Sequence, residues 1–272
     1  MLAKKTYVLI LTVLLIMGWA PAAIAATTTS NTKELELDFK YYYMNYKEVD
    51  TDESFLDSET GWLNGFNLAY KIQIPNTQYY GQINYEITNH KTDYDGFTWG
   101  GVPAQGTTSN QIINVEILFT SPITLMPNSF LSFGLGFHRW YRDLLAIQKE
   151  EYSWFYIPIG YRWNKNINNK WEVALDITAK VMFKGQLTGI FSDYDIVRVD
   201  LGSKPGLKID LPLTYKLNSN WAMTIKPWYE YSSIGQSNWV LLTQDGIPVA
   251  SVSEPDSTTH RHGIDFGVKY VY

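Results

Sequence analysis

Hydrophobic and polar residues alternate with a period of two along this chain, from Glu34 to the last residue, Tyr272. A period of two is that of a β-strand with one apolar face and one polar face. Turn-forming residues divide the alternation into ten segments, at 34–47, 62–74, 79–91, 110–121, 129–142, 152–164, 170–184, 205–217, 220–233 and 260–272. The pattern predicts an all-β fold of ten strands.

The connections between these segments alternate in length. Four are short, at 75–78, 122–128, 165–169 and 218–219, and the other five are longer and rich in Asp, Gly, Ser and Thr, at 48–61, 92–109, 143–151, 185–204 and 234–259. An even number of strands with short turns on one side and long loops on the other is typical of barrels that span an outer membrane. We therefore expect a ten-stranded antiparallel transmembrane up-and-down β-barrel, with short periplasmic turns and long outer loops.

Aromatic residues indicate which face of each strand meets lipid. On the apolar parity, one set lies beside the short turns, namely Tyr79, Trp163, Trp171, Tyr215, Trp221 and Tyr272. A second set on the same parity lies at the long-loop ends, namely Tyr43, Trp62, Tyr141, Phe183 and Tyr231. Two aromatic belts around an apolar band are expected where a barrel crosses the two lipid interfaces. The apolar parity is therefore predicted to face outward.

The N-terminus predicts export. Lys4 and Lys5 precede an apolar run, 7–19, and the small residues Ala23 and Ala25 follow it. This is the pattern of a secretory signal peptide, here residues 1–25, although an uncleaved anchor helix is the alternative. The expected organisation is a cleaved signal at 1–25, a short segment at 26–33 and an outer-membrane barrel at 34–272.

The polar parity places charged residues in the barrel interior. The carboxylates are Glu36, Asp38, Glu86, Glu116, Glu172, Asp176, Asp210, Glu230 and Asp265. The cations are Lys40, Lys71, Arg142, Arg162, Lys180, Lys208, Lys226 and Lys269. The lumen of a ten-stranded barrel is narrow, so we expect these groups to pair and fill it; a narrow charged channel is the alternative.

Composition argues against several other functions. The chain has no cysteine, a net charge of -5 and no basic tract, which excludes a disulfide framework and gives no reason to expect nucleic acid as a partner. His260 and His262 have a spacing that can chelate a metal, but no third ligand is adjacent in sequence. The acidic stretches 50–53 and 193–200 do not follow EF-hand spacing. We expect no metal site and no cofactor.

The last ten residues end on an aromatic and alternate before it, with Phe266, Val268, Tyr270 and Tyr272 on the apolar parity. This segment resembles the terminal β-signal of outer-membrane barrels. The resemblance implies recognition by the outer-membrane assembly machinery. It also implies outer-membrane lipid and lipopolysaccharide as surroundings.

Ten strands with five long outer loops resemble the omptin proteases in topology. Omptins activate water with an Asp pair on one outer loop and an Asp–His pair on the facing wall. Asp93 and Asp95 match the first pair, whereas Asp193 and Asp195 lie where the second pair would be and have no histidine beside them. The resemblance implies Asp93, Asp95, His260 and His262 as catalytic candidates, with the two histidines coming from the fifth loop.

The predicted outer loops also hold apolar residues, namely Phe55, Leu56, Phe97, Trp99, Ile190, Phe191, Trp239, Val240, Leu241 and Leu242. Apolar residues on water-facing loops indicate either a contact surface or packing over the barrel mouth. The expected function is a closed barrel with a structural role or with an unidentified ligand bound at its surface. The alternatives are an omptin-like surface hydrolase and a narrow pore.

Overall fold

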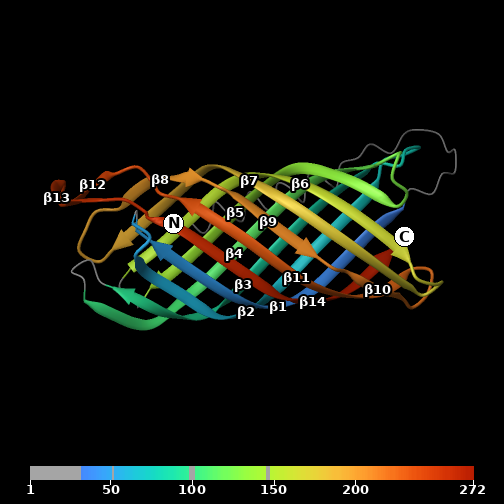
Figure 1. Cartoon of the computed structure of the whole chain (residues 1–272), viewed down its shortest axis with the longest axis horizontal. Coiled ribbons are helices and arrows are strands. Elements are labelled where there is room, and N and C mark those ends of the chain that lie inside the picture. The colour runs from blue at the N-terminus through green and yellow to red at the C-terminus, as the bar shows by residue number, and fades with distance from the viewer. Residues whose placement is uncertain (1–31, 51, 98–101, 145–147) are drawn as a thin grey trace. The chain divides into compact units, whose positions relative to one another are not determined.

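The computed structural model describes residues 32–50, 52–97, 102–144 and 148–272 (Figure 1). The predicted signal peptide and residues 26–31 lie outside this part of the chain, as does Trp99. Within the described ranges, no helix is long and apolar enough to cross a bilayer.

The strands close into a ten-stranded antiparallel barrel, which confirms the predicted fold class. Each of the first seven strands pairs with the next, β11 pairs with β14, and β14 pairs with β1. Three short strands close the remaining gap between β7 and β11. The bounds are β1 Lys33–Val49, β2 Phe55–Gln73, β3 Tyr80–Phe97, β4 Pro103–Pro122, β5 Ser129–Leu144, β6 Gln148–Asn166, β7 Trp171–Phe191, β8 Val197–Ser203, β9 Pro205–Asp210, β10 Leu213–Lys216, β11 Trp221–Gly235 and β14 Asp256–Val271.

The eighth wall strand is divided into β8, β9 and β10. Breaks occur at Lys204 and at Leu211–Pro212, beside prolines at 205 and 212. Proline lacks the N–H that a ladder requires, which accounts for interruptions at these points. The sequence pattern predicted one strand at 205–217 and a loop at 185–204. The predicted loop is wrong at Val197–Ser203, where β8 forms.

The wall extends further toward the long-loop end than the sequence pattern indicated. β2 begins at Phe55, β3 runs to Phe97 and β4 begins at Pro103, so most of the expected loops at 48–61 and 92–109 are strand. On β1 the outward residues change from Leu37, Phe39 and Tyr41 to Asn45 and Lys47. The wall therefore has an apolar band and, beyond it, an outer extension with a polar outside surface.

A bulge in β7 changes the parity of that strand. Ser153 pairs with Gln186 while Phe155 pairs with Phe183, so β7 has one extra residue there. Lys184 occupies the bulge with a φ of 50° and is exposed. Lys184 has the same parity as Lys180, which faces the lumen, and the bulge is the reason that Lys184 lies outside.

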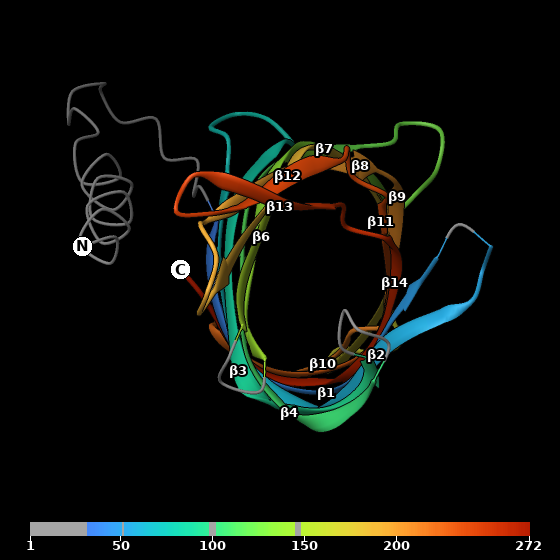
Figure 2. The ribbon, with the colours of Figure 1, turned by 90° about the vertical axis from the view of Figure 1, so that its left-hand side faces the viewer.

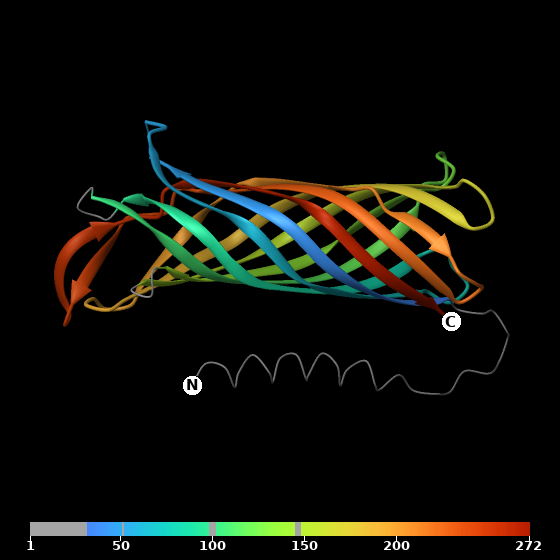
Figure 3. The same cartoon turned by 90° about the horizontal axis from the view of Figure 1, so that it is seen from below.

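A separate hairpin lies within the last long connection, where the sequence pattern gave only a loop. It consists of β12, Val240–Gln244, and β13, Ile247–Val252, which pair only with each other. Its turn residues, Asp245 and Gly246, have φ values of 52° and 78°. Two successive positive φ angles at Asp-Gly are typical of the tight hairpin turn. The hairpin projects at the long-loop end of the barrel (Figure 3).

Candidate functional site

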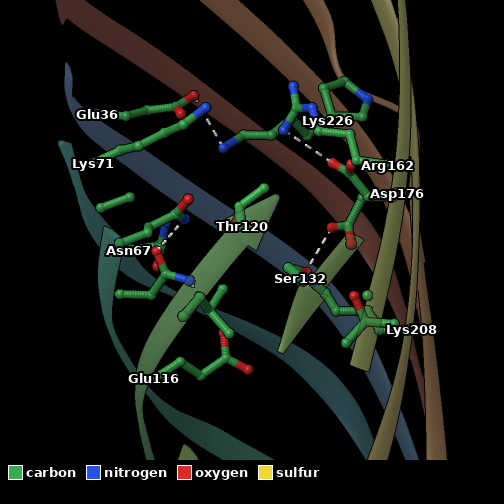
Figure 4. A pocket seen from close by; sticks show the side chains of 18 of the residues that line it. Glu36, Asn67, Lys71, Glu116, Thr120, Ser132, Arg162, Asp176, Lys208 and Lys226 are labelled. Carbon is green, nitrogen blue, oxygen red and sulfur yellow. Dashed lines mark hydrogen bonds and ion pairs between the residues drawn. The ribbon is translucent and has the colours of Figure 1, made fainter. Parts of the chain in front are cut away.

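The interior of the barrel divides into two parts with different chemistry. The half beside the short turns holds a polar cavity of about 360 Å³ (Figure 4). All of the lumen charges expected from the sequence line this cavity except Asp38 and Arg142. Asp38 is buried beside it, and Arg142 lies in the other half, toward the long loops. We call the first half the polar chamber.

Ion pairs hold most charges of the polar chamber in place. Near the short turns, Lys226 lies 3.1 Å from Glu36 and 2.7 Å from Asp38. Lys269 lies 3.0 Å from Glu34, a carboxylate that the sequence analysis did not assign to the lumen. Such pairing neutralises the wall of the chamber and ties strands β1, β11 and β14 together.

A second group of pairs lies at mid-height. Lys40 contacts Glu86 at 3.0 Å and Asp265 at 3.1 Å, and its ammonium lies 4.6 Å from the centre of the Trp228 ring. The indole N–H of Trp228 donates to Asp265 at 2.7 Å. These contacts link the side chains of β1, β3, β11 and β14 along one side of the chamber wall.

Arg261 is a lumen cation that the sequence analysis missed. It is buried and pairs with Glu230 at 3.1 Å, while Lys180 reaches the same carboxylate at 2.9 Å. Arg261 lies within the predicted strand at 260–272 and shares the parity of Asp265 and Lys269, so the alternation could have identified it.

Arg142 lies at the centre of the outer half and is 1% exposed. Its Nε donates to Glu59 at 2.9 Å, and its Nη1 donates to Glu150 at 2.8 Å and to the hydroxyl of Tyr152 at 3.0 Å. Glu48 lies 3.6 Å away. The guanidinium also stacks near aromatic rings, with its carbon 4.8 Å from the centre of Tyr46 and 5.0 Å from that of Trp140.

Five buried carboxylates surround this one cation. They are Glu48, Asp57, Glu59, Glu150 and Glu254, which we call the acidic cluster. Among the described residues, Arg142 is the only cation within ion-pair distance of any of them. All five lie in stretches that the sequence pattern assigned to outer loops, at 48–61, 143–151 and 234–259, which is why none was expected in the lumen.

Burial and crowding raise the proton affinity of part of the acidic cluster. Burial, together with the charge of Glu48, raises the pKa of Asp57 to about 9. Burial raises the pKa of Glu254 well above its usual range, and the charges of Glu48 and Glu150 raise it further. Burial also raises the pKa of Glu48. These groups lie beyond the outer aromatic belt, outside the apolar band. Asp57 therefore retains its proton at neutral pH in this arrangement.

Apolar side chains fill the rest of the outer half. This packing, together with Arg142 and the acidic cluster, is called the outer plug. Its buried apolar members are Tyr42, Met44, Tyr46, Leu63, Ile112, Trp140, Tyr152, Met182, Leu187, Val197, Val199, Leu201, Trp228, Ile234 and Leu242. Leu242 comes from the hairpin and is 1% exposed. In the view from the long-loop end, β12 and β13 lie across part of the ring of strands (Figure 2).

The catalytic candidates are not brought together. Asp93 and Asp95 are exposed on the outside of β3, and Asp95 accepts a hydrogen bond from Gln105 at 3.1 Å. His260 and His262 are exposed on the outside of β14, which is separated from β3 by β1 and β2. The arrangement described offers no shared site in which these four side chains could activate one water.

Asp195 has a structural role instead of completing a catalytic pair. It accepts a hydrogen bond from the hydroxyl of Thr243 at 2.6 Å and another from the backbone N–H of Gly246 at 2.9 Å. It thereby ties the hairpin to the connection between β7 and β8. In the described part of the chain, no three His, Cys, Asp or Glu side chains are arranged to hold a metal ion.

The residues of the expected assembly signal occupy the outside of the closing strand. Phe266 and Val268 lie on the apolar band, and Tyr270 packs against Trp221 with ring centres 4.6 Å apart. β14 is the strand that closes the barrel, because it pairs with β1, the first strand, on one side and with β11 on the other.

Comparison with known proteins places this fold among outer-membrane barrels. No family model matches the chain, and no curated protein matches its sequence. The outer membrane protease OmpT of Escherichia coli shares 9% identity with a TM-score of 0.54, and the match covers 93% of this chain and 100% of OmpT. OprG of Pseudomonas aeruginosa shares 10% identity with a TM-score of 0.39, over 89% and 96% of the two chains. Ail of Yersinia pestis shares 14% identity with a TM-score of 0.35, over 88% and 99%.

The chain has the fold of the Gram-negative outer-membrane β-barrels. Its ten-stranded wall is similar to that of OmpT, and at this level of identity the likeness concerns the fold alone.

Proposed function

We propose that the protein is a closed barrel that acts at the cell surface through its outer extension and hairpin. The observation that carries this proposal is the outer plug, in which packed apolar side chains and the Arg142 network occupy the lumen beneath the hairpin. A continuous aqueous path would require this packing to separate. The narrow-pore alternative therefore has less support than a closed barrel.

The hydrolase alternative lacks an assembled site. The Asp pair and the histidines face outward on different strands, and the aspartate at 195 is bonded to the hairpin. General acid–base catalysis needs its partners within hydrogen-bond reach of one reacting group. A surface-binding or structural role does not have this requirement.

The hairpin supplies the most prominent candidate contact surface. Trp239 is 65% exposed, and Leu241, Ile247 and Val249 are also exposed. These side chains project outward while Leu242 of the same hairpin is buried in the plug. Part of the apolar sequence expected in the outer loops thus seals the mouth, and the rest is available for an unidentified ligand.

The outer extension also suits contact with lipopolysaccharide. Lys47, Lys91 and Lys149 are exposed on the outside of β1, β3 and β6, beyond the apolar band. Cations at that height suit the phosphate groups of the outer leaflet. Insertion by the assembly machinery through the β14 signal completes the proposed route to the membrane.

Single-cysteine labelling tests both the display and the seal, since the chain has no native cysteine. Val249→Cys at the hairpin should react on intact cells with a membrane-impermeant maleimide, because its side chain is exposed. Ser132→Cys, in the polar chamber, should react only after the outer membrane is permeabilised and reagent reaches the periplasmic side. Labelling of Ser132→Cys on intact cells would show an open lumen, and failure to label Val249→Cys would show that the hairpin is not displayed.

A further inference from the structure

The hairpin is attached to the barrel in a way that allows it to move as a unit. β12 and β13 form their own two-stranded sheet and share no ladder with the wall. The two legs meet at their base, where Ser237 N–H donates to the carbonyl of Glu254 at 2.9 Å and Glu254 N–H donates to the Ser237 hydroxyl at 2.7 Å. Lifting this unit would break side-chain contacts and a few loop hydrogen bonds, but no strand pairing of the barrel.

Glu254 attaches this base to the opposite wall. The Tyr152 hydroxyl donates to its carboxylate at 2.6 Å, lies 3.2 Å from Glu150 and accepts from Arg142. A phenol has one proton, so it can donate to only one of the two carboxylates. Arg142 pairs with Glu150, whereas no cation among the described residues lies within ion-pair distance of Glu254, so burial beside Glu150 disfavours an ionised Glu254.

Asp57 is a second buried carboxylate that has no cation within ion-pair distance among the described residues. It is buried, and its Oδ1 has no hydrogen-bond partner among the described residues. The charged groups that face it are Arg142 and the carboxylates Glu48, Glu59 and Glu150. One guanidinium cannot balance five ionised carboxylates in a site that excludes water.

We propose that the hairpin and its base are a proton-dependent gate, held closed by the acidic cluster and released when Glu254 and Asp57 ionise. Release would lift Glu254 and Leu242 from the outer plug. Below the plug lies the polar chamber, whose charged and amide side chains are suited to hydrated ions. Water admitted beneath the lifted hairpin would hydrate the acidic cluster, and repulsion among its ionised carboxylates would loosen the wall packing around Arg142. In this proposal, ions would then reach the chamber.

The direction of the pH effect follows from the raised proton affinity. The closed state holds the Asp57 proton more tightly than an open, hydrated state, in which this acid returns toward its usual pKa of 3.8. Raising the pH above that value progressively favours the open state, and the effect is complete near the closed-state pKa of about 9.

Other titratable and charged groups face Asp57 and Glu254 from the surrounding strands. They are Tyr46 and Glu48 of β1, Glu59 of β2, Tyr94 of β3, Arg142 of β5, and Glu150 and Tyr152 of β6. Lys204 and Asp256 form an ion pair at the base of the gate, 2.8 Å apart.

The test is single-channel recording of the purified full-length protein in planar bilayers from pH 5 to pH 9.5. We expect the open probability to rise with pH. For each pKa unit by which Asp57 or Glu254 differs between the closed and open states, the ratio of open to closed protein should rise about tenfold. The double variant Asp57→Asn and Glu254→Gln should remain closed at pH 9.5. The matched control Glu151→Gln, whose side chain lies on the outside of β6 in a pair with Arg139, should behave as the wild type.

An engineered disulfide identifies the moving part. The side chains of Asp195 and Thr243 touch, so the pair Asp195→Cys and Thr243→Cys should form a crosslink that fixes the hairpin. Oxidation should abolish the openings at high pH, and a reductant should restore them. Openings that persist in the oxidised protein, or wild-type protein that stays closed at pH 9.5, would overturn the gate. This inference rests on the proposed closed barrel, whose own failure would be distinct, because it would appear as stable openings at pH 6.

Discussion

Replacing Arg142 with methionine is expected to destabilise the barrel by about 3–5 kcal/mol, because it leaves buried carboxylates without their cation. Glu59 and Glu150 would each lose a hydrogen bond of less than 3 Å from the guanidinium. The aromatic contacts to Tyr46 and Trp140 would lose their cation as well. Urea unfolding in lipid vesicles, followed by tryptophan fluorescence, measures the change in free energy of unfolding.

Arg139→Met is the matched control for this prediction. Arg139 is on the same strand with the opposite parity, and it pairs at 2.7 Å with Glu151 on the outside of the wall. Partly exposed pairs of this kind contribute no more than about 1 kcal/mol. Equal losses of unfolding free energy in the two variants would show that the interior network around Arg142 stabilises the barrel no more than a surface ion pair does.

Replacing Phe266 with arginine should cost about 2–4 kcal/mol, because it places a charge on the lipid face near the middle of the apolar band. Phe266 is 51% exposed and central among the outward apolar residues of β14, between Ile264 and Val268. Folding yield in vesicles, judged by the shift of unheated protein on gels, and urea unfolding give the readout.

Asn45→Arg introduces the same side chain at a different height. Asn45 is exposed on the outside of β1, beyond the apolar band, where it pairs with His260 of β14. The cost of a charge falls to about 0–1 kcal/mol near the membrane interface. A similar penalty at both positions would argue against the assigned band and its depth.

The membrane-spanning part of the fold could be predicted from sequence because lipid imposes a simple pattern. Outward residues must be apolar there, so residues such as Leu37, Phe39 and Phe266 mark the face and the register directly. The short turns interrupt that pattern sharply. The ten strands and their order therefore follow from alternation and loop length.

The outer extension could not be predicted in the same way, because the chemistry of its two faces is reversed. On β1 the residues Tyr42, Met44 and Tyr46 are buried inside, while Asn45 and Lys47 face water outside. Beyond the lipid the apolar face points inward, as it does in a soluble barrel. A parity fixed in the membrane assigns this stretch to loop and misses Glu48, Asp57 and Glu59 as interior residues.

The hairpin and its buried acid were missed for a related reason. Asp245-Gly246 between apolar residues is a local hairpin signal, but Glu254 is separated from Tyr152 by 102 positions in sequence. No local pattern connects them. Likewise, Asp93 and His260 could be assigned to the outer end of the barrel, whereas the side of the wall on which each lies depends on strand register.

We propose that the outer plug closes the barrel while the acidic cluster holds its protons. Planar-bilayer recording of the purified wild-type protein at pH 6 tests it most directly. We expect no discrete conductance steps, since the packing around Arg142 and Leu242 interrupts the lumen. Stable open channels at that pH would contradict it.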